Sequence, residues 1–318
     1  MDLPIEIKSY IENELNNISK KELQYNAETI SLNYRNNEGQ GKRMLKSKQE
    51  AIAYAISRMP ATFGAVYNSL KHTLEICKAD INTLADIGAG TGTASIAANE
   101  LLELEKIECF EREEAMRAIG QKIFNSYNEL GIKTNWKKYD VNTDKINDKY
   151  DLVITSYMIN EIEETNIEVV IDKLWDTTNK ILLIVEPGTM QGYRNIMRAK
   201  QRIIERGGKI IAPCMSEKCK LPKDDWCNFS CRVQRTKIHK ELKGGNVPYE
   251  DEKYIYISAI KEEFDKKEKN RILRHPMIYS GYVKLKVCNK EEIKEIIISK
   301  KDKEKFKIAR KADTGDLI

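Results

Sequence analysis

The sequence predicts an α/β protein built round a doubly wound, mainly parallel sheet. Three observations support this fold class. Short apolar segments alternate with amphipathic helical segments between residues 83 and 185, which is the pattern of successive βαβ units. A loop rich in glycine follows the first apolar segment. The segment Ile181–Val185 is a continuous apolar run, typical of a parallel strand that is buried on both faces.

Each element of this sheet can be assigned from its pattern. The predicted strands are Thr83–Ile87, Lys106–Phe110, Thr134–Tyr139, Tyr150–Ser156 and Ile181–Val185. The predicted helices that connect the first three are Ala94–Leu104 and Glu113–Leu130. The alternation stops near Lys209, after which residues 212–245 show no clear period. Later strands are predicted at Lys253–Ile260, Tyr282–Val287 and Ile293–Ser299, the last two as a hairpin around Asn289.

These elements divide the chain into four parts. Residues 1–77 form a helical N-terminal region, in which Pro60 is expected to break or kink a helix and a second helix follows. Residues 78–208 form the core that carries the glycine loop. Residues 209–250 form a cysteine-rich insertion, and such a long irregular segment should carry its own organiser. Residues 251–318 are expected to complete the sheet and to end in a basic tail.

Composition is typical of a globular protein, with 41% hydrophobic and 32% charged residues among 318. No run reaches the roughly 18 apolar residues that span a bilayer, and the N-terminus lacks the pattern of a signal peptide. We therefore expect a cytoplasmic protein that does not bind membranes. The net charge is +5, yet the segment 194–243 holds 14 Lys or Arg against five Asp or Glu residues. This local excess indicates either a surface that faces a polyanion such as RNA or a solvated face around anionic thiolates.

The glycine loop has the sequence Asp86-Ile87-Gly88-Ala89-Gly90-Thr91-Gly92. Glycines let the backbone turn sharply after a strand and approach a ligand closely. The spacing Gly-x-Gly-x-Gly, the acid before it and the acids that end the next two strands favour S-adenosylmethionine over a nicotinamide cofactor. Glu111 would accept hydrogen bonds from the ribose hydroxyls, and Asp140 would meet the adenine amino group. The residues expected to bind the cofactor are Asp86, Gly88, Ala89, Gly90, Gly92, Glu111, Asp140 and Tyr157.

The methyl-acceptor side has no recognisable catalytic motif. The residues after the fourth strand, Thr155–Glu161, include neither an Asn/Asp-Pro-Pro-aromatic motif nor a Pro-Cys pair. Tyr157, Asn160 and Glu161 are either polar groups of the cleft or caps of the following helix. We therefore assign no catalytic residue from the sequence, and transfer of a methyl group stays an open question at this point.

Four cysteines lie within the insertion, at positions 214, 219, 227 and 231. In a reducing compartment disulfides are not expected. Cys214, Cys219 and Cys227 could supply three soft ligands, with Cys288 or Cys231 as the fourth. Four thiolates suit zinc or an iron–sulfur cluster, and a bound metal would provide the organiser that the insertion needs. The alternative is a set of free thiols.

Several unusual segments occur together in an order that resembles a known family. They are Ser57–Phe63, Asp86–Thr93, Val185–Thr189, Ala212–Cys214, Asp225–Ser230, Tyr249–Lys253, Ser280–Val283, Ala309–Lys311 and Gly315-Asp316. From about residue 45 to the C-terminus, the chain resembles the mitochondrial small-ribosomal-subunit methyltransferase-like family of assembly factors and its bacterial relatives. One departure is that Met215-Ser216 stands where the family often has Pro-His after the first cysteine.

The resemblance implies a class I S-adenosylmethionine methyltransferase fold, Rossmann-like, whose partner is the small ribosomal subunit and its rRNA. It also implies a four-iron–four-sulfur cluster rather than zinc, with Cys214, Cys219, Cys227 and Cys288 as ligands. We expect a monomer away from the ribosome. Three functions remain open: an rRNA methyltransferase, a non-catalytic assembly factor that only binds the cofactor, and a small-molecule methyltransferase with a structural zinc loop.

Overall fold

The computed structural model describes residues 2–15, 47–127, 132–216, 247–264 and 269–318, with parts of the segments 21–32 and 217–240. Its helices are α1 (Ile5–Leu15), α3 (Lys48–Leu74), α4 (Thr93–Asn99), α5 (Glu114–Tyr127), α6 (Ile167–Thr177), α7 (Met190–Glu205) and α9 (Lys303–Lys311). Its strands are β1 (Thr83–Ile87), β2 (Lys106–Glu111), β3 (Lys133–Lys138), β4 (Tyr150–Ser156), β5 (Thr178–Pro187), β6 (Lys209–Ala212), β7 (Phe229–Gln234), β8 (Tyr249–Ile260), β9 (Arg271–Ile272), β10 (Met277–Ile278), β11 (Tyr282–Cys288) and β12 (Ile293–Ser299).

The main sheet confirms the doubly wound, Rossmann-like class. Its strand order is β3-β2-β1-β4-β5-β8-β6, and β7 pairs with the first half of β8. The first five strands are parallel, whereas β8 runs antiparallel to its neighbours β5, β6 and β7. Because strand order reverses at β1 and β4, the carboxyl ends of these two strands form a crevice, where ligands of such sheets bind.

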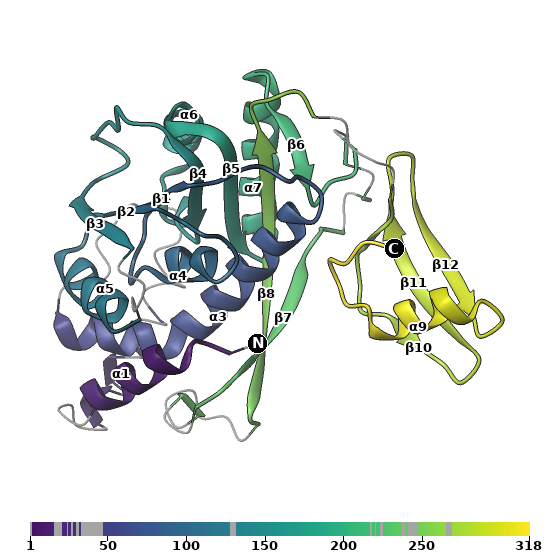
Figure 1. The fold of residues 1–318 in the computed structure, drawn as a ribbon, viewed down its shortest axis with the longest axis horizontal. Coiled ribbons are helices and arrows are strands. Elements are labelled where there is room, and N and C mark those ends of the chain that lie inside the picture. Colours follow the sequence, from purple (N-terminus) through teal and green to yellow (C-terminus); the bar gives the residue numbers. More distant parts are fainter. Residues whose placement is uncertain are drawn as a thin grey trace.

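Helices cover both faces of this sheet (Figure 1). On one face, α3, α4 and α5 lie against the strands, and α1 packs on α5 and α3. On the other face, α6 and α7 lie side by side and pack against β4, β5 and β8. Two apolar cores result, one on each side of the sheet. Strands β1, β4 and β5 are buried along almost their whole length, which explains their continuous apolar sequences.

Helix α3 differs from the expectation of two helices separated at Pro60. The structure has one helix of 27 residues with Pro60 inside it. A proline removes one helical hydrogen bond, at the carbonyl four residues before it. The residues on either side, Met59 and Ala61, are buried, so packing of both halves against the core outweighs that loss. Ser47 begins the helix with a reciprocal capping box to Glu50.

The insertion and the C-terminal part contain structure that the sequence pattern did not reveal. Two strands, β6 and β7, flank the cysteine-rich segment and both pair with β8. Of the C-terminal strands, only β8 completes the main sheet. Strands β9, β10, β11 and β12 form a second, four-stranded sheet, so the expectation that all of them join the main sheet was wrong. The predicted β11–β12 hairpin is confirmed, with Cys288 opposite Ile293.

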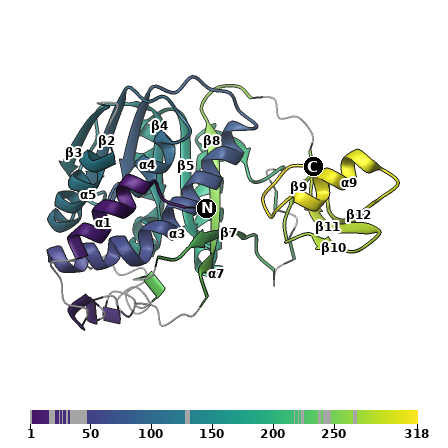
Figure 2. The ribbon, with the colours of Figure 1, turned by 60° about the horizontal axis from the view of Figure 1, so that its bottom comes forward.

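The second sheet and α9 form a separate unit beside the β6–β8 edge of the main sheet (Figures 1 and 2). The expected basic tail is helix α9, which Asp302 caps. Phe306 and Ala309 of α9 pack on Val283, Leu285 and Val287 of β11, which gives this unit its own small core. No helix in the described part of the chain is both long and apolar enough to cross a membrane.

Candidate functional site

The crevice at the carboxyl ends of β1, β2, β3 and β4 contains a pocket. It holds about 810 Å³ of space not occupied by atoms, including its open mouth. Five of the eight residues expected to bind the cofactor line it, namely Gly88, Gly90, Glu111, Asp140 and Tyr157. The structure therefore brings together residues from four different strand ends.

The glycine loop turns tightly from β1 into α4. Gly88 has a φ of +74° and Gly92, the N-cap of α4, has a φ of +78°, a region that other residues rarely adopt. The amides of Gly88 and Ala89 donate to the Phe110 carbonyl at 2.9 and 3.1 Å, which fixes the loop against β2. Neither Ala89 nor Gly92 lines the pocket. Their contribution in the structure is to the shape of the loop.

Asp86 also lies behind the pocket wall and not on it. Its side chain is fully buried, and its Oδ2 accepts hydrogen bonds from the amide and hydroxyl of Ser95, at 3.0 and 2.8 Å. Its Oδ1 has no partner among the described residues. Burial raises the pKa of Asp86 to about 7, although the Ser95 hydrogen bonds act in the opposite direction. A direct contact of Asp86 with the cofactor stays a prediction.

Glu111 lies at the end of β2 and connects the glycine loop to the start of α5. Its Oε2 accepts from the Gly90 amide at 2.8 Å, and its Oε1 accepts from the Glu113 amide at 2.7 Å. Burial raises the pKa of this carboxyl, and the two amides oppose the rise. Each oxygen of a carboxylate has a second lone pair. Glu111 can therefore hold the loop and still accept a hydrogen bond from a ligand.

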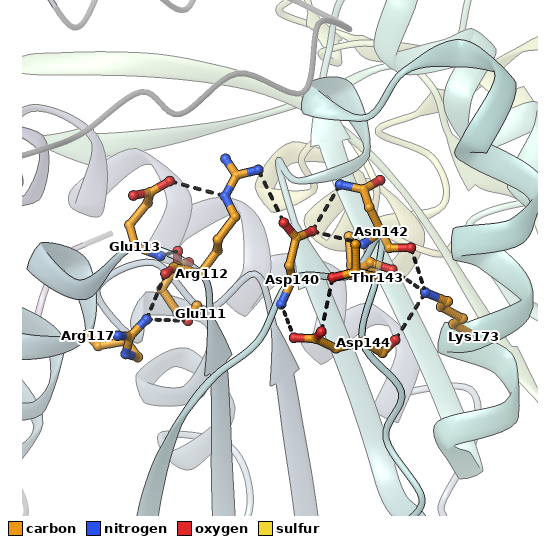
Figure 3. A network of polar contacts seen from close by, with 10 residues as sticks. Glu111, Arg112, Glu113, Arg117, Asp140, Asn142, Thr143, Asp144 and Lys173 are labelled. Carbon is orange, nitrogen blue, oxygen red and sulfur yellow. Dashed lines mark hydrogen bonds and ion pairs between the residues drawn. The ribbon is translucent and has the colours of Figure 1, made fainter.

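Asp140 lies at the neighbouring strand end, within a polar network (Figure 3). Its Oδ1 accepts from the backbone and side-chain amides of Asn142, both at 3.0 Å, and its backbone amide donates to Asp144. Arg112 lies between Glu113, at 3.1 Å, and Asp140, at 3.9 Å. The network fixes the positions of Glu113 and Asp140, two acids that line the pocket.

Other residues of the pocket were not predicted. They are Tyr54, Arg112, Glu113, Met116, Tyr139, Val141, Asn142, Ser156, Met158 and Ile162. Most of them lie at the end of a predicted strand or within three residues after it, so proximity in the sequence could have identified them. Glu161, which the sequence offered as a polar group of the cleft or a helix cap, also lines the pocket. Tyr54 could not be found in this way, because α3 reaches the pocket only through the tertiary fold.

Tyr157 directly follows β4 and is the one non-glycine residue with a positive φ among the described residues, at +60°. Its amide donates to the Val185 carbonyl at 2.8 Å, and its hydroxyl donates to Glu252 of β8 at 2.8 Å. Burial and the nearby Glu252 raise the pKa of Tyr157. The phenol is thus held as a neutral donor to a carboxylate. Backbone strain of this kind is often found at functional sites.

Glu186, near the end of β5, is a buried acid that the sequence did not identify as a site residue. It is fully buried, and its Oε1 accepts from the Ile159 amide at 3.1 Å. Its Oε2 is 3.5 Å from Asn195 Nδ2. Burial raises the pKa of Glu186 to about 8. It supports the loop after β4 from beneath.

A second pocket is lined by the four cysteines implied by the resemblance. Cys214, Cys219 and Cys227 reach it from the β6–β7 connection, and Cys288 reaches it from the end of β11. Burial and the neighbouring Cys214 and Cys219 raise the pKa of Cys288 to about 11, and burial raises the pKa of Cys227. Within the described part of the chain, no three His, Cys, Asp or Glu side chains stand close enough together to hold a metal ion.

The other candidate ligand, Cys231, does not line this pocket. It lies on β7, is 4% exposed, and packs against α3, where a Cβ on Gly64 would come within 2.9 Å of its sulfur. Strand β7 turns it away from the other three thiols. Its place in the structure is that of a buried apolar side chain.

Contacts from three elements support the cysteine pocket. Tyr193 of α7 donates to Cys219 Sγ at 3.3 Å, and Lys200 of α7 donates to the Ser216 carbonyl at 2.9 Å. Trp226 Nε1 donates to the Gly188 carbonyl, which follows β5, at 3.0 Å. Asp225 accepts from Arg274 and Lys286 of the C-terminal unit. The cysteine-rich segment is therefore anchored both to the main sheet and to the second one.

The basic segment 194–243 is partly neutralised within the protein. Arg202 of α7 and Arg206, which caps its end, form ion pairs with Asp172 of α6, at 2.7 and 2.8 Å. Arg232 of β7 and Arg235, which follows it, pair with acids on β8. Much of the local excess of positive charge thus serves to join neighbouring elements. The electrostatic argument for a polyanion is weaker than the sequence count suggested.

Comparisons with known proteins agree with the resemblance. The family model described as mitochondrial small ribosomal subunit Rsm22 matches residues 48–318. The human mitochondrial ribosome assembly protein METTL17 is 25% identical over 199 residues, which cover 57% of this chain and 42% of that protein. The match thus spans less than half the length of this relative.

Solved structures of similar fold are more distant in sequence. The magnesium protoporphyrin IX methyltransferase of Synechocystis, with S-adenosylhomocysteine bound, is 13% identical, with a TM-score of 0.43, over 70% of this chain and 90% of that one. The ribosomal protein L11 methylase of Lactobacillus delbrueckii is 14% identical, with a TM-score of 0.39, over 62% of this chain and 77% of that one. It is the family match, over residues 48–318, that identifies the protein: the chain belongs to the Rsm22 family.

Proposed function

We propose that this chain is an S-adenosylmethionine-binding, methyltransferase-like protein that acts on the small ribosomal subunit and holds a four-iron–four-sulfur cluster. The observation that carries the cofactor part is the pocket at the carboxyl ends of β1 to β4. It combines a glycine turn with two acids, Glu111 and Asp140, at successive strand ends. An acid at the end of the second strand is the usual partner of ribose hydroxyls in such sheets.

Each residue of this pocket has a definable task. Glu111 would accept the ribose hydroxyls, and its position is fixed by the Gly90 and Glu113 amides. Asp140 would accept the exocyclic amine of the adenine. The glycine turn allows the backbone to approach the ligand. When bound, S-adenosylmethionine supplies a methyl group on a positively charged sulfur, which is an electrophile.

The ribosomal part of the proposal rests on the family. Its description names the mitochondrial small ribosomal subunit, and the related human protein is named as a ribosome assembly protein. The C-terminal region 269–318 adds 14 Lys or Arg against seven Asp or Glu residues. Such an excess favours association with RNA phosphates, which weakens as salt increases.

The cluster part rests on the donor set. Four thiols from two distant parts of the chain surround one pocket, and thiolates are the ligands that iron–sulfur clusters and zinc prefer. One charged side chain at the pocket, Arg271, is 1% exposed, and its Nε and Nη2 have no partner among the described residues. These features fit an anionic metal–thiolate centre. When bound, such a centre would supply covalent ties between the insertion and β11.

The residues near the proposed methyl-acceptor side favour an assembly function as the second candidate. The Tyr157 hydroxyl already donates to Glu252, and Glu186 lies buried beneath the loop. Neither is placed to take a proton from an acceptor in the pocket. A protein that binds the cofactor without methyl transfer is consistent with this arrangement.

Three measurements on one preparation test the proposal. Protein purified without oxygen should contain about four iron and four sulfide per chain. Protein that contains zinc and no iron would overturn the cluster and identify a zinc site. Calorimetry should detect binding of S-adenosylmethionine. Small-subunit particles from a strain that lacks the gene should bind the protein at low salt, and loss of all such binding would overturn the ribosomal part.

The same particles distinguish the two candidate functions. Incorporation of a labelled methyl group into small-subunit RNA, absent when the particles come from the parent strain, would identify a methyltransferase. Cofactor binding and particle binding with no incorporation would identify an assembly factor.

A further inference from the structure

The strongest unexplained feature outside the cofactor pocket is the buried cation Arg271. It lies on β9, directly opposite Cys288 of β11 in the antiparallel pairing. Both residues line the cysteine pocket. The side chain is 1% exposed, one of the largest fully buried side chains in the structure. A guanidinium cannot lose its charge by releasing a proton in a protein, so this burial requires an anionic or strongly polar partner.

The described residues provide only part of that partner. Arg271 Nη1 donates to the Gly315 carbonyl, whereas Nε and Nη2 find no acceptor among the described residues. The nearby cations differ in this respect. Lys200 donates to the Ser216 carbonyl, and Arg274 donates to Asp225. Among the cations that the structure describes, Arg271 alone combines near-complete burial, two nitrogens without an acceptor and a place on the wall of the cysteine pocket.

We propose that Arg271 is the buried counter-ion of the metal–thiolate centre and donates its free N–H groups to sulfur in that centre. Four thiolates around a divalent zinc ion, or around an iron–sulfur cluster, carry net negative charge. Hydrogen bonds from a neighbouring donor to the sulfurs stabilise that charge. Arg271 is thus a positioning residue of the site, and the proposal rests on the metal centre of the proposed function.

The proposal has a consequence that a merely structural arginine would not have. Without metal, Arg271 keeps its charge while its Nε and Nη2 have no acceptor among the described residues, so this buried charge destabilises the fold. With metal it gains its partner and stabilises the bound state. Replacement by an apolar side chain of similar length should therefore act in opposite directions on the two forms.

The test compares wild type with Arg271→Met, Arg271→Lys and the control Lys290→Met, whose side chain is exposed in the loop after Cys288. All are purified without oxygen, and the rate at which a chelator removes the metal is measured. The metal-free forms are then melted. Arg271→Met should lose its metal about tenfold faster or more, as is typical when a hydrogen-bonding partner of a metal site is removed. Its metal-free form should melt at the same temperature as wild type or higher.

Arg271→Lys keeps the charge but not the planar set of donors, so its rate of metal loss should fall between those of wild type and Arg271→Met. If Arg271→Met does not fold, the comparison of Arg271→Lys with wild type tests the proposal. Lys290→Met should match wild type in both measurements. Unchanged metal loss, or a metal-free Arg271→Met form that melts below wild type, would overturn the proposal and leave Arg271 as a structural donor to Gly315. Wild-type protein with neither iron nor zinc would instead overturn the metal centre itself, and the counter-ion with it.

Discussion

Replacement of Glu186 by Gln should change how the stability of the protein depends on pH. Glu186 is fully buried beneath the loop after β4, and its pKa is raised from 4.5 to about 8 because burial disfavours the charged form. In the unfolded chain the same side chain ionises near its ordinary pKa. Between these two values the native protein holds a proton that the unfolded chain has released.

The sign and size of the effect follow from this difference. A raised native pKa contributes stability that is fully present below the unfolded pKa and is lost as pH rises through the native pKa. One extra proton in the native state lowers the free energy of unfolding by about 1.4 kcal/mol per pH unit. Between about pH 5.5 and 7.5, the titration of Glu186 alone should therefore lower the free energy of unfolding of wild type by about 3 kcal/mol.

Glutamine has the shape of the protonated acid and does not titrate. Its carbonyl oxygen can accept from the Ile159 amide, and its amide faces Asn195, which can present either end of its own amide. The free energy of unfolding of Glu186→Gln should hence decline less with rising pH than that of wild type. Urea denaturation at several pH values measures the difference, with the exposed Glu103→Gln as a control that should follow wild type.

Curves for wild type and Glu186→Gln that run parallel from pH 5.5 to 7.5 would refute this reasoning. They would mean that the native protein holds Glu186 ionised at neutral pH. Divergence that begins as expected but continues well above pH 8 would place the native pKa higher than the structure indicates.

Four other substitutions test the two pockets and the glycine loop. Glu111→Gln should weaken S-adenosylmethionine binding by about 10- to 150-fold in calorimetry, because charge-assisted hydrogen bonds are lost, and unchanged affinity would remove Glu111 from the cofactor site. Cys288→Ser should abolish metal binding in an iron and zinc assay, whereas Cys231→Ser should retain the wild-type content; the reverse result would exchange their roles. Gly92→Ala should lower the free energy of unfolding in urea by about 1–2 kcal/mol, because its φ is +78°, and an equally stable variant would show that the loop adapts.

Part of the cofactor site could be predicted because its residues occupy fixed places in a repeating pattern. In parallel strands that alternate with helices, the carboxyl ends lie at one edge, so acids that end successive strands come close together. Glu111 and Asp140 follow this rule and line one pocket. Asp86 does not line the pocket, because its side chain turns toward Ser95 at the start of α4, and its contact with the cofactor stays a prediction. A strand end specifies the edge of the sheet, but the side-chain direction depends on the packing of the next helix.

The cysteine site was less predictable. Spacing alone left Cys231 and Cys288 as alternatives, because a ligand set has no required separation along the chain. The structure distinguishes the two candidates. Strand β7 directs Cys231 against α3, and β11 brings Cys288 to the pocket of the other three. Arg271, the charged residue beside them, could not be recognised from the sequence because its burial depends on the second sheet.

By itself, the sequence determined the parallel core, the glycine turn after β1, and the set of acids and thiols from which the two pockets are built. These are local or periodic properties, set by backbone preference and by the alternation of apolar residues. Only the tertiary structure decided that α3 continues through Pro60, that β8 alone of the strands after residue 250 joins the main sheet, and which thiols line one pocket. Such features depend on contacts between residues far apart in the chain, whose packing energies outweigh local preference.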